Sequence, residues 1–337
     1  MFKYFLKSIA IMLSAIIVAG IIGGALISKR HADNEEETKG TLDNASSAIS
    51  AEKVVERPLC VLIIGKDKVS SLADVIMLAS FDRASKKACI LQIPRDTYAE
   101  YGSSYVKING ALNALGEDGM CDFFENSMGI EIDGYISLEL EGFRGLVDAI
   151  GGVDINVPKS LKYSDPEQGL YIDLPAGKQT LNGKQAEMLV RYRSGYARGD
   201  LDRLDMQKRF LAAFFLQLKE KITLFNVYSI ANSAIPYLKT NISAPSLVSL
   251  ALSVVGADSG DISIATLPGE DAISSISGGS FYVVSALGAS ELIETYFGAE
   301  SGSFDKNGSF LHPSLKNFQE IYQKRVENRV FLADEFK

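Results

Sequence analysis

The hydrophobic pattern divides the chain into three parts. Residues 8–28 contain no charged side chain and are almost all apolar. A helix rises about 1.5 Å per residue, so a run of this length can span the ~30 Å hydrocarbon core of a bilayer. Residues 29–57 are rich in Glu, Ser, Ala, Asn and Lys without an apolar period, which is typical of a flexible tether. From residue 58 onward apolar runs alternate with polar segments, as expected of a folded domain.

The first apolar segment fits an uncleaved transmembrane helix better than a signal peptide. It is longer than the usual apolar core of a signal peptide, and no clear small-x-small cleavage site follows it. Lys3 and Lys7 precede it and Lys29 and Arg30 follow it, so the positive-inside rule does not decide the orientation. Because only residues 1–7 precede the helix, we expect a single-pass type II protein of the cell membrane. Residues 1–7 would be its cytoplasmic tail, and everything after the tether would be extracytoplasmic.

Within residues 58–300, strand-like and helix-like segments alternate. Continuous apolar runs predict strands over 59–65, 74–81, 88–93, 134–140, 153–157 and 262–267. Helical periodicity predicts helices over 111–128, 142–150, 183–190, 203–221, 246–255 and 286–297. Strands that are apolar throughout are buried on both faces, so we expect one α/β domain with a mixed central sheet and helices on both faces. Residues 301–337 turn polar and are expected to form a C-terminal extension with a peripheral helix near residues 315–329.

Composition argues against several kinds of function. The net charge of -8 leaves no basic excess to neutralise phosphates along a duplex, so we expect no nucleic-acid partner. The chain has only 2 histidines, so neither a histidine-based triad nor a multi-histidine metal site is expected. Its 3 cysteines, Cys60, Cys89 and Cys121, lack zinc-site or redox spacing and are interpreted as small buried apolar residues. The sequence leaves a bridge between Cys60 and Cys89 open.

Charged residues stand at the ends of the first three predicted strands. The first strand is followed by Asp67 and Lys68, the second begins at Asp74, and the third is followed by Arg95 and Asp96. One charge at a strand end is usually a solvated loop residue, but a sheet can bring several such ends together. Two carboxylates, Asp67 and Asp74, beside the cations Lys68 and Arg95 would suit a hard divalent ion and phosphate oxygens.

A fourth group of charges follows residue 190. Arg191 and Arg193 alternate, which would place them on one side of an extended segment. Arg203 and Gln207 lie four residues apart on one face of the next helix, and Asp200 precedes them. The N-terminus of that helix would favour an anion such as a phosphate. The pattern alone fits equally well a surface on which these arginines pair with neighbouring aspartates.

In series, these segments resemble the LytR-CpsA-Psr family. The matching stretches cover most of residues 59–220: LCVLIIGKDK (59–68), ADVIMLASFD (73–82), ILQIPRDTY (90–98), YVKINGA (105–111), EGFRGLVDAIGGVDINVP (141–158), LNGKQAEMLVRYR (181–193) and GDLDRLDMQKRFL (199–211). The resemblance implies a membrane-anchored phosphotransferase. Such enzymes move teichoic acid or capsular polysaccharide from a polyprenyl pyrophosphate-linked donor to peptidoglycan, forming a phosphodiester.

The resemblance also assigns roles to site residues. Asp67 and Asp74 match two aspartates that hold Mg²⁺, and Lys68 stands where the family often has a basic residue. Four residues match the arginines that grip the phosphates: Arg95, Arg191, Arg193 and Arg203. Gln207 matches a polar residue that lines the site, and Asp96 and Asp200 match carboxylates that orient arginines or assist proton transfer. The polyprenyl tail would need an apolar groove, for which the second strand and the helices near Phe123 and Phe143 are candidates.

The chain also departs from the family pattern. The family commonly has Arg-Ser-Asp-Thr around its second aspartate, whereas residues 72–75 here are Leu-Ala-Asp-Val, and the loop before Asp74 is short. Two alternatives therefore stay open. The protein could bind polyprenyl phosphate or act as a regulatory surface protein with little turnover, or it could hydrolyse polyprenyl pyrophosphate.

Overall fold

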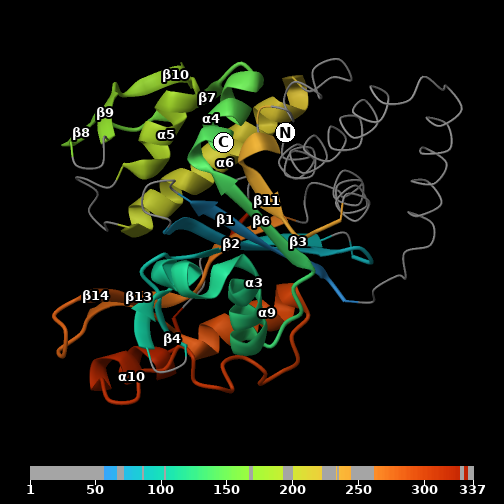
Figure 1. Ribbon diagram of the computed structural model, residues 1–337, viewed down its shortest axis with the longest axis vertical. Helices are drawn as coiled ribbons and strands as arrows, with labels where there is room; N and C mark the ends of the chain where they lie inside the picture. The colour runs from blue at the N-terminus through green and yellow to red at the C-terminus, as the bar shows by residue number, and fades with distance from the viewer. Residues whose placement is uncertain are drawn as a thin grey trace, which may run out of the picture.

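A seven-stranded mixed sheet forms the centre of the domain (Figure 1). The computed structural model describes residues 57–66, 72–85, 87–101, 104–166, 170–192, 200–221, 233, 235–243, 262–326 and 330–332. The order of the strands across the sheet is β11-β6-β1-β2-β3-β12-β15. Their bounds are β1 (Leu59–Lys66), β2 (Ala73–Asp82), β3 (Lys87–Ile93), β6 (Gly134–Glu139), β11 (Leu238–Thr240), β12 (Ile262–Thr266) and β15 (Phe331–Leu332).

Pairing in the sheet is both parallel and antiparallel, as the sequence predicts. β1, β2 and β3 pair antiparallel, and the β2–β3 hairpin agrees with the predicted turn between them. β6 runs parallel to β1 and β12 runs parallel to β3. As a result β1, β3, β6 and β12 all end at the same edge of the sheet.

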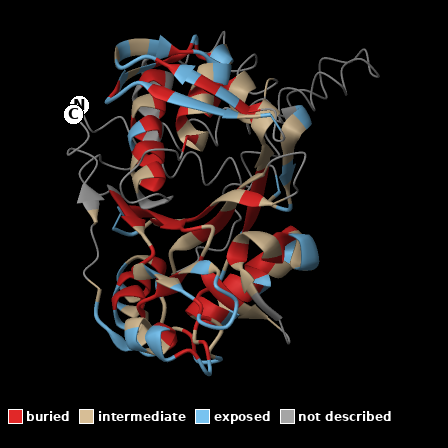
Figure 2. Cartoon of the chain, turned by 90° about the vertical axis from the view of Figure 1, so that its left-hand side faces the viewer, coloured by how far each residue is buried: buried red, intermediate tan, exposed pale blue. Residues whose placement is uncertain are grey.

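Helices cover both faces of the sheet. On one face lie α4 (Leu140–Ala149), α5 (Gly183–Arg191) and α6 (Asp200–Lys221), whose apolar side chains join those of Val61 and Ile136 in one core cluster. On the other face lie α3 (Ile108–Met128) and α9 (Ala286–Phe297), packed with Leu62 and Leu78 in a second cluster. Figure 2 shows the buried sheet between these two layers. Successive residues of β1 point alternately into the two clusters. Both faces of the strand are therefore buried, which is why its sequence is apolar along its whole length.

Each predicted helix within the described residues has a counterpart in the structure. Two of them, α3 and α6, start three residues earlier than predicted. α3 begins three residues before the predicted start and contains a kink at Gly116, where φ is 66°. α6 begins at Asp200 rather than at residue 203. α5 starts with a capping box, in which Asn182 and Gln185 exchange side chain-to-backbone hydrogen bonds. The predicted helix over 246–255 lies outside the described residues.

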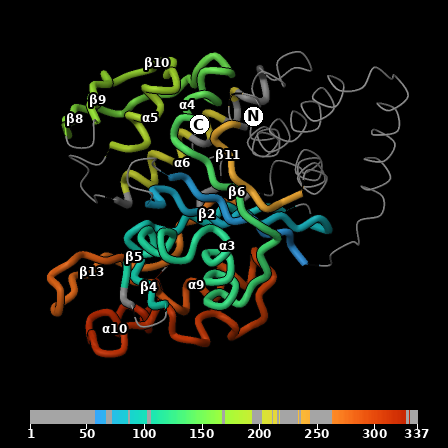
Figure 3. The backbone as a smooth tube through the Cα atoms, viewed as in Figure 1, coloured from blue at the N-terminus to red at the C-terminus, as the bar shows by residue number. Residues whose placement is uncertain are grey.

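Four two-stranded sheets lie outside the central one and were not predicted as such. They pair β4 (Tyr98–Tyr101) with β5 (Ser104–Lys107), β7 (Val153–Val157) with β10 (Gly177–Leu181), β8 (Leu161–Asp165) with β9 (Leu170–Leu174), and β13 (Gly269–Ile273) with β14 (Ser280–Val284). Only β7 was predicted as a strand. In β8 only Leu161 is buried, so its apolar pattern is weak, whereas β9 alternates the buried residues Leu170, Ile172 and Leu174 with exposed ones over only five positions. Figure 3 shows the β13 hairpin projecting from the domain.

A bridge between Cys60 and Cys89 is excluded by the order of the strands. β2 lies between β1 and β3, and Ser80 of β2 is the register partner of both cysteines. Two strand spacings separate the cysteines by about 10 Å, whereas bridged cysteines have Cα atoms within about 7 Å. All three cysteines are free and buried, as the composition suggested.

The described part of the chain after residue 300 packs on the domain. We expected residues 301–337 to form a polar extension with a peripheral helix. Instead Phe310 and Phe318 are buried, the latter on α10 (Lys316–Gln323), and β15 pairs with β12 at the edge of the central sheet. The segment is polar on average, but a few buried aromatic residues that lie far apart in its sequence attach it to the domain.

The N-terminal predictions concern residues outside the described part. The cytoplasmic tail, the transmembrane helix and all but the last residue of the tether lie there. No helix within the described residues is both long and apolar enough to cross a membrane. Arg57, the last tether residue, pairs with Glu131 at 2.6 Å and with Asp133 at 3.0 Å, so the described chain starts fixed to the domain.

Asp305 makes stability depend on pH in the acid range. It is 5% exposed, and burial raises the pKa of its carboxyl to about 6, although hydrogen bonds from Tyr322 and Phe310 oppose the rise. A carboxyl whose pKa is raised by folding contributes stability that is full below its ordinary pKa of 3.8 and is lost as pH rises through about 6.

We therefore expect Asp305→Asn, which cannot ionise, to flatten this pH dependence. Between about pH 4 and pH 7 the unfolding free energy of the wild type should fall by roughly 2 to 3 kcal/mol more than that of the variant. Urea unfolding at several pH values measures the difference. Parallel curves for the two proteins would show that folding does not shift the titration of Asp305.

Candidate functional site

The carboxylate of Asp74 and the guanidinium of Arg95 form an ion pair at the edge where β1 and β3 end. Asp74 lies in a bulge near the start of β2, because Lys66 faces Ala73 and Gly65 faces Val75. Nη1 of Arg95 donates to Oδ1 of Asp74 at 2.6 Å. The two side chains are 31% (Asp74) and 18% (Arg95) exposed, so solvent reaches the pair. The structure thus brings together two of the residues that the strand ends predicted.

The turn that carries Arg95 is held from two sides. Asn109, in the first turn of α3, donates its N–H to the carbonyl oxygen of Arg95 at 3.1 Å. Tyr282 of β14 donates its N–H to the carbonyl oxygen of Asp96 at 2.9 Å. The carboxylate of Asp96 pairs with Lys107 at 3.2 Å. These hydrogen bonds fix the backbone from which the Arg95 side chain extends. The role of Asp96 in catalysis stays a prediction.

A charged group that the sequence analysis missed holds the end of β1. The side chain of Glu117 on α3 is 7% exposed, and its two oxygens accept from Lys66 at 2.9 Å and from Lys239 at 2.6 Å. Burial alone would raise the pKa of this carboxyl, but the two lysines outweigh burial and lower it to about 2. Lys66 ends β1, so Glu117 fixes the strand end from which the segment with Asp67 and Lys68 departs.

Arg191 belongs to a second buried carboxylate cluster. Glu187 of α5 is 4% exposed and accepts from Arg191 at 2.8 Å and from Arg144 of α4. We expected Arg191 and Arg193 on one side of an extended segment. Arg191 is instead the last residue of α5, because the helix continues to Tyr192 as its C-cap, and Arg193 lies outside the described residues.

Arg203 and Gln207 lie on the face of α6 that packs inward. They are 3% and 5% exposed, and their spacing places them with the buried residues Met206 and Phe210. Gln207 donates from Nε2 to the carbonyl oxygen of Val190 at 3.1 Å, which joins α6 to the end of α5. An arginine on a buried helix face is uncommon and marks a candidate site, although a structural ion pair would bury it as well.

The predicted site residues that the structure describes therefore form two groups, called here the two halves of the site. One is the Asp74–Arg95 pair at the sheet edge, and the other is the end of α5 with the first turns of α6. Both halves lie at the end of the sheet that Figure 1 shows on the left, and Val75 and Met206 pack in one apolar cluster. Asp67, Lys68 and Arg193 fall outside the described residues, and only the backbone of Asp200 is described, at the start of α6.

Phe123 and Phe143, both candidates for lining the lipid groove, lie on opposite faces of the sheet, so at most one of them can line a single groove. Phe123 lies on α3 and packs with Phe310 on one face of the sheet. Phe143 lies on α4 and packs with Phe210 of α6 on the opposite face, with ring centroids 5.5 Å apart. One groove cannot include both rings, because the sheet separates them.

A divalent metal fits the donors at Asp74 only together with a substrate. No group of three or more His, Cys, Asp or Glu residues within the described chain could hold a metal. Asp74 contacts Arg95 through one oxygen and stays 31% exposed. Mg²⁺ is commonly held by one or two carboxylates plus substrate phosphates rather than by a closed protein cage.

The chain is similar to known proteins in sequence and in fold. The teichoic acid transferase TagV of Bacillus subtilis is 27% identical over 272 residues, which cover 77% of this chain and 69% of TagV. The cell wall biosynthesis protein LcpA of Corynebacterium glutamicum is 28% identical over 257 residues, which cover 67% of this chain and 48% of LcpA. The crystal structure of B. subtilis TagV superposes with a TM-score of 0.61 at 25% identity, covering 72% of this chain and 96% of that structure. The model of the LytR_cpsA_psr family matches residues 24–297, and the chain therefore belongs to the LytR_cpsA_psr family.

Proposed function

We propose that this protein transfers a phospho-glycopolymer from a polyprenyl pyrophosphate carrier to peptidoglycan. The polymer would be of the teichoic acid or capsular polysaccharide type, and the product a phosphodiester. The observation that carries the proposal is the Asp74–Arg95 ion pair at the sheet edge, in a fold that also places Arg203 on the inner face of α6. The relative TagV is a protein named polyisoprenyl-teichoic acid–peptidoglycan teichoic acid transferase, and this similarity supports the same reaction class.

The reaction needs charge neutralisation more than a covalent intermediate. A sugar hydroxyl of the acceptor attacks the phosphorus that carries the glycan, and the bond from that phosphorus to the bridging oxygen breaks. Polyprenyl phosphate leaves with that oxygen, and the hydroxyl proton passes to a carboxylate or to water. Negative charge on the phosphates is best stabilised by fixed cations in a partly desolvated site. Arg95, Arg191 and Arg203, each 18% or less exposed, have this character.

Bound Mg²⁺, held by Asp74 and Asp67, would add a positive charge beside the diphosphate. Within the chain itself, Arg95 restrains the Asp74 carboxylate at 2.6 Å, so a ligand oxygen meets an oriented carboxylate and guanidinium together. Arg95 could exchange part of its contact with Asp74 for a phosphate oxygen, because guanidinium groups bind carboxylate and phosphate with similar geometry.

The proposal includes the location that the sequence predicts. Residues 8–28 would anchor the protein in the cell membrane as a type II single-pass protein, and residues 29–57 would tether the domain outside. This placement gives the domain access both to a lipid-linked donor in the membrane and to the cell wall. The apolar tail of the donor would lie on the face covered by α4, α5 and α6, since Val75 and Met206 of that cluster adjoin the site.

The full-length protein in lipid vesicles should convert a short polyprenyl pyrophosphate glycan and peptidoglycan strands into a phosphodiester-linked adduct in the presence of Mg²⁺. Phosphorus NMR and mass spectrometry of the digested wall detect the adduct, and removal of Mg²⁺ with a chelator should abolish it. Release of free glycan phosphate without adduct would identify a hydrolase. Bound lipid with neither product, across several donors, would identify a binding protein instead.

A further inference from the structure

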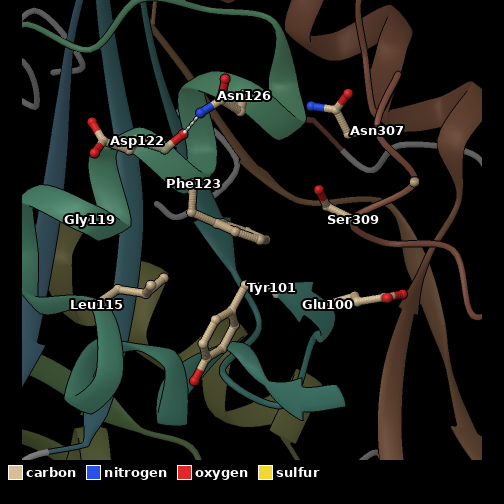
Figure 4. Close-up of a pocket in the computed structure, with 10 residues that line it drawn as sticks. Glu100, Tyr101, Leu115, Gly119, Asp122, Phe123, Asn126, Asn307 and Ser309 are labelled. Carbon is tan, nitrogen blue, oxygen red and sulfur yellow. Dashed lines mark hydrogen bonds between the residues drawn. The ribbon is translucent and has the colours of Figure 1, made fainter. Parts of the chain in front are cut away.

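A pocket that is open to solvent lies on the other face of the sheet from α6. It has a volume of about 450 Å³ and is lined by three segments: the end of β4, the middle of α3 and the loop over residues 307–309. Figure 4 shows the Phe123 ring between α3 and the loop that carries Asn307 and Ser309. A volume of this size is typical of a small-molecule site.

The walls of this cavity are fixed to one another without a ligand. Glu100 of β4 donates its N–H to the carbonyl oxygen of Ser309 at 2.7 Å, which joins the strand to the loop. Asp305 donates its N–H to the carbonyl oxygen of Ser127 at 2.6 Å, which joins the loop to α3. The rings of Phe123 and Phe310 meet edge to face at 5.7 Å beneath the cavity. The pocket is therefore preformed, so a ligand would not have to order it.

The path of α3 keeps the pocket open. The helix is interrupted at Gly116, directly after Leu115, which lines the pocket. Gly119 lines it one turn later, and a Cβ there would lie 2.9 Å from Cβ of Leu115. Any larger residue at 119 would displace Leu115 or fill the space. A glycine at this position therefore lets Leu115 keep its place in the wall of the pocket.

The lining combines an apolar floor with a polar, acidic rim. Leu115, Phe123 and the ring of Tyr101 form the floor. The rim consists of two carboxylates, two carboxamides and one hydroxyl: Glu100, Asp122, Asn126, Asn307 and Ser309. No lysine, arginine or histidine is among the lining residues within the described chain. A phosphate would meet only negative charge here, whereas hydroxyl and amide N–H groups would find acceptors on the rim.

We propose that this pocket binds one sugar residue of an uncharged glycan strand. A pyranose ring presents an apolar face of C–H groups and an edge of hydroxyl groups, which matches an apolar floor with a polar rim. Glu100 follows Arg95 by five residues, and five residues span at most about 18 Å, so the Cα atom of this lining residue lies within that distance of the Cα atom of Arg95. Identifying the strand as the peptidoglycan acceptor rests on the proposed function; sugar binding by itself does not.

Binding can be measured without any catalysis. The probe is a tetramer of β-1,4-linked N-acetylglucosamine, titrated by calorimetry and NMR into the full-length protein in detergent. Asp122→Ala and Asn307→Ala remove exposed rim groups, and each should weaken binding about five- to tenfold, as expected for the loss of one or two hydrogen bonds. Asn113→Ala, an equally exposed asparagine on α3 that does not line the pocket, is the matched control and should leave binding unchanged.

A blocking variant and a charged probe complete the test. Asn126→Trp places a large ring over the pocket from an exposed helix position and should abolish binding while its circular dichroism spectrum stays that of the wild type. An oligomer of glycerol phosphate should bind at least tenfold more weakly than the sugar tetramer, because the rim is acidic. Tighter binding of this phosphate oligomer, or unchanged sugar binding in all three pocket variants, would overturn the proposal.

The design separates this inference from the proposed function. Arg95→Ala should keep the sugar affinity of the wild type, since Arg95 does not line the pocket. If the sugar binds but no donor is ever transferred, the pocket assignment stands and the transferase proposal fails. If transfer occurs and the pocket variants transfer to peptidoglycan with unchanged KM, the pocket is not the acceptor subsite.

Discussion

Arg95→Ala should lower the rate of glycopolymer transfer by at least about a hundredfold, with little change in stability. Loss of one preorganised donor to developing negative charge commonly costs a factor of about 10² to 10³. Arg95 contacts Asp74, the predicted metal ligand, with 2.6 Å between Nη1 of Arg95 and Oδ1 of Asp74. Both side chains retain solvent exposure, 31% for Asp74 and 18% for Arg95, so removing one leaves no fully buried charge behind. The melting temperature should therefore stay within about 4 °C of the wild type.

Two further variants serve as comparisons for Arg95→Ala. Arg95→Lys keeps the charge but loses the planar fork, so its activity should fall between those of the wild type and the alanine variant. Arg325→Ala removes an exposed arginine that pairs with Glu291 at 2.8 Å and should change neither rate nor stability. Transfer by Arg95→Ala at more than a third of the wild-type rate would show that the ion pair is structural only.

Glu117→Gln should be the most destabilising of the conservative changes considered, by roughly 3 kcal/mol at neutral pH. The pKa of Glu117 is lowered from 4.5 to about 2, because hydrogen bonds from Lys239 and Lys66 outweigh the effect of burial. A difference of this size between the folded and unfolded states corresponds to roughly 3 kcal/mol. Because the pKa is depressed in the folded state, the contribution is present above the unfolded value of 4.5 and is lost as pH falls toward about 2.

The matching measurement is urea unfolding of both proteins between about pH 2 and pH 7. The difference in unfolding free energy should be full at pH 7, should shrink below the ordinary pKa of 4.5 and should nearly vanish at the acid end. Glu131→Gln is the control, because Glu131 also forms an ion pair, with Arg57, but is 72% exposed, and its effect should stay within about 0.5 kcal/mol. A difference between wild type and Glu117→Gln that does not vary with pH would mean that the lost contacts, not the charge, cause the destabilisation.

The central sheet could be predicted because its strands are apolar along their whole length. β1, β2, β3, β6 and β12 each lie within one or two residues of the predicted ranges. Their order could not be predicted, since an apolar strand does not specify its neighbours. The hairpin β8–β9 was missed because its strands are short: Lys162 to Ser164 of β8 face solvent, and the apolar alternation of β9 extends over only five residues.

The site was predictable only in part. Asp74 and Arg95 were found because each stands at the end of a strongly apolar strand. Glu117 was missed because its two lysine partners lie 51 and 122 residues away in the sequence, on β1 and β11. No local sequence pattern predicts contacts over such separations. The position of Arg191 was misjudged for a local reason, since α5 extends one residue beyond its predicted end and includes it.

A structure of the chain bound to a short polyprenyl pyrophosphate tests the central claim most directly. Oxygens of one diphosphate should contact both Arg95 and Arg203, with the tail lying under α6 on the face that holds Phe210. A diphosphate bound on the α3 face, or one that contacts Arg95 while Arg203 touches no phosphate oxygen, would contradict it.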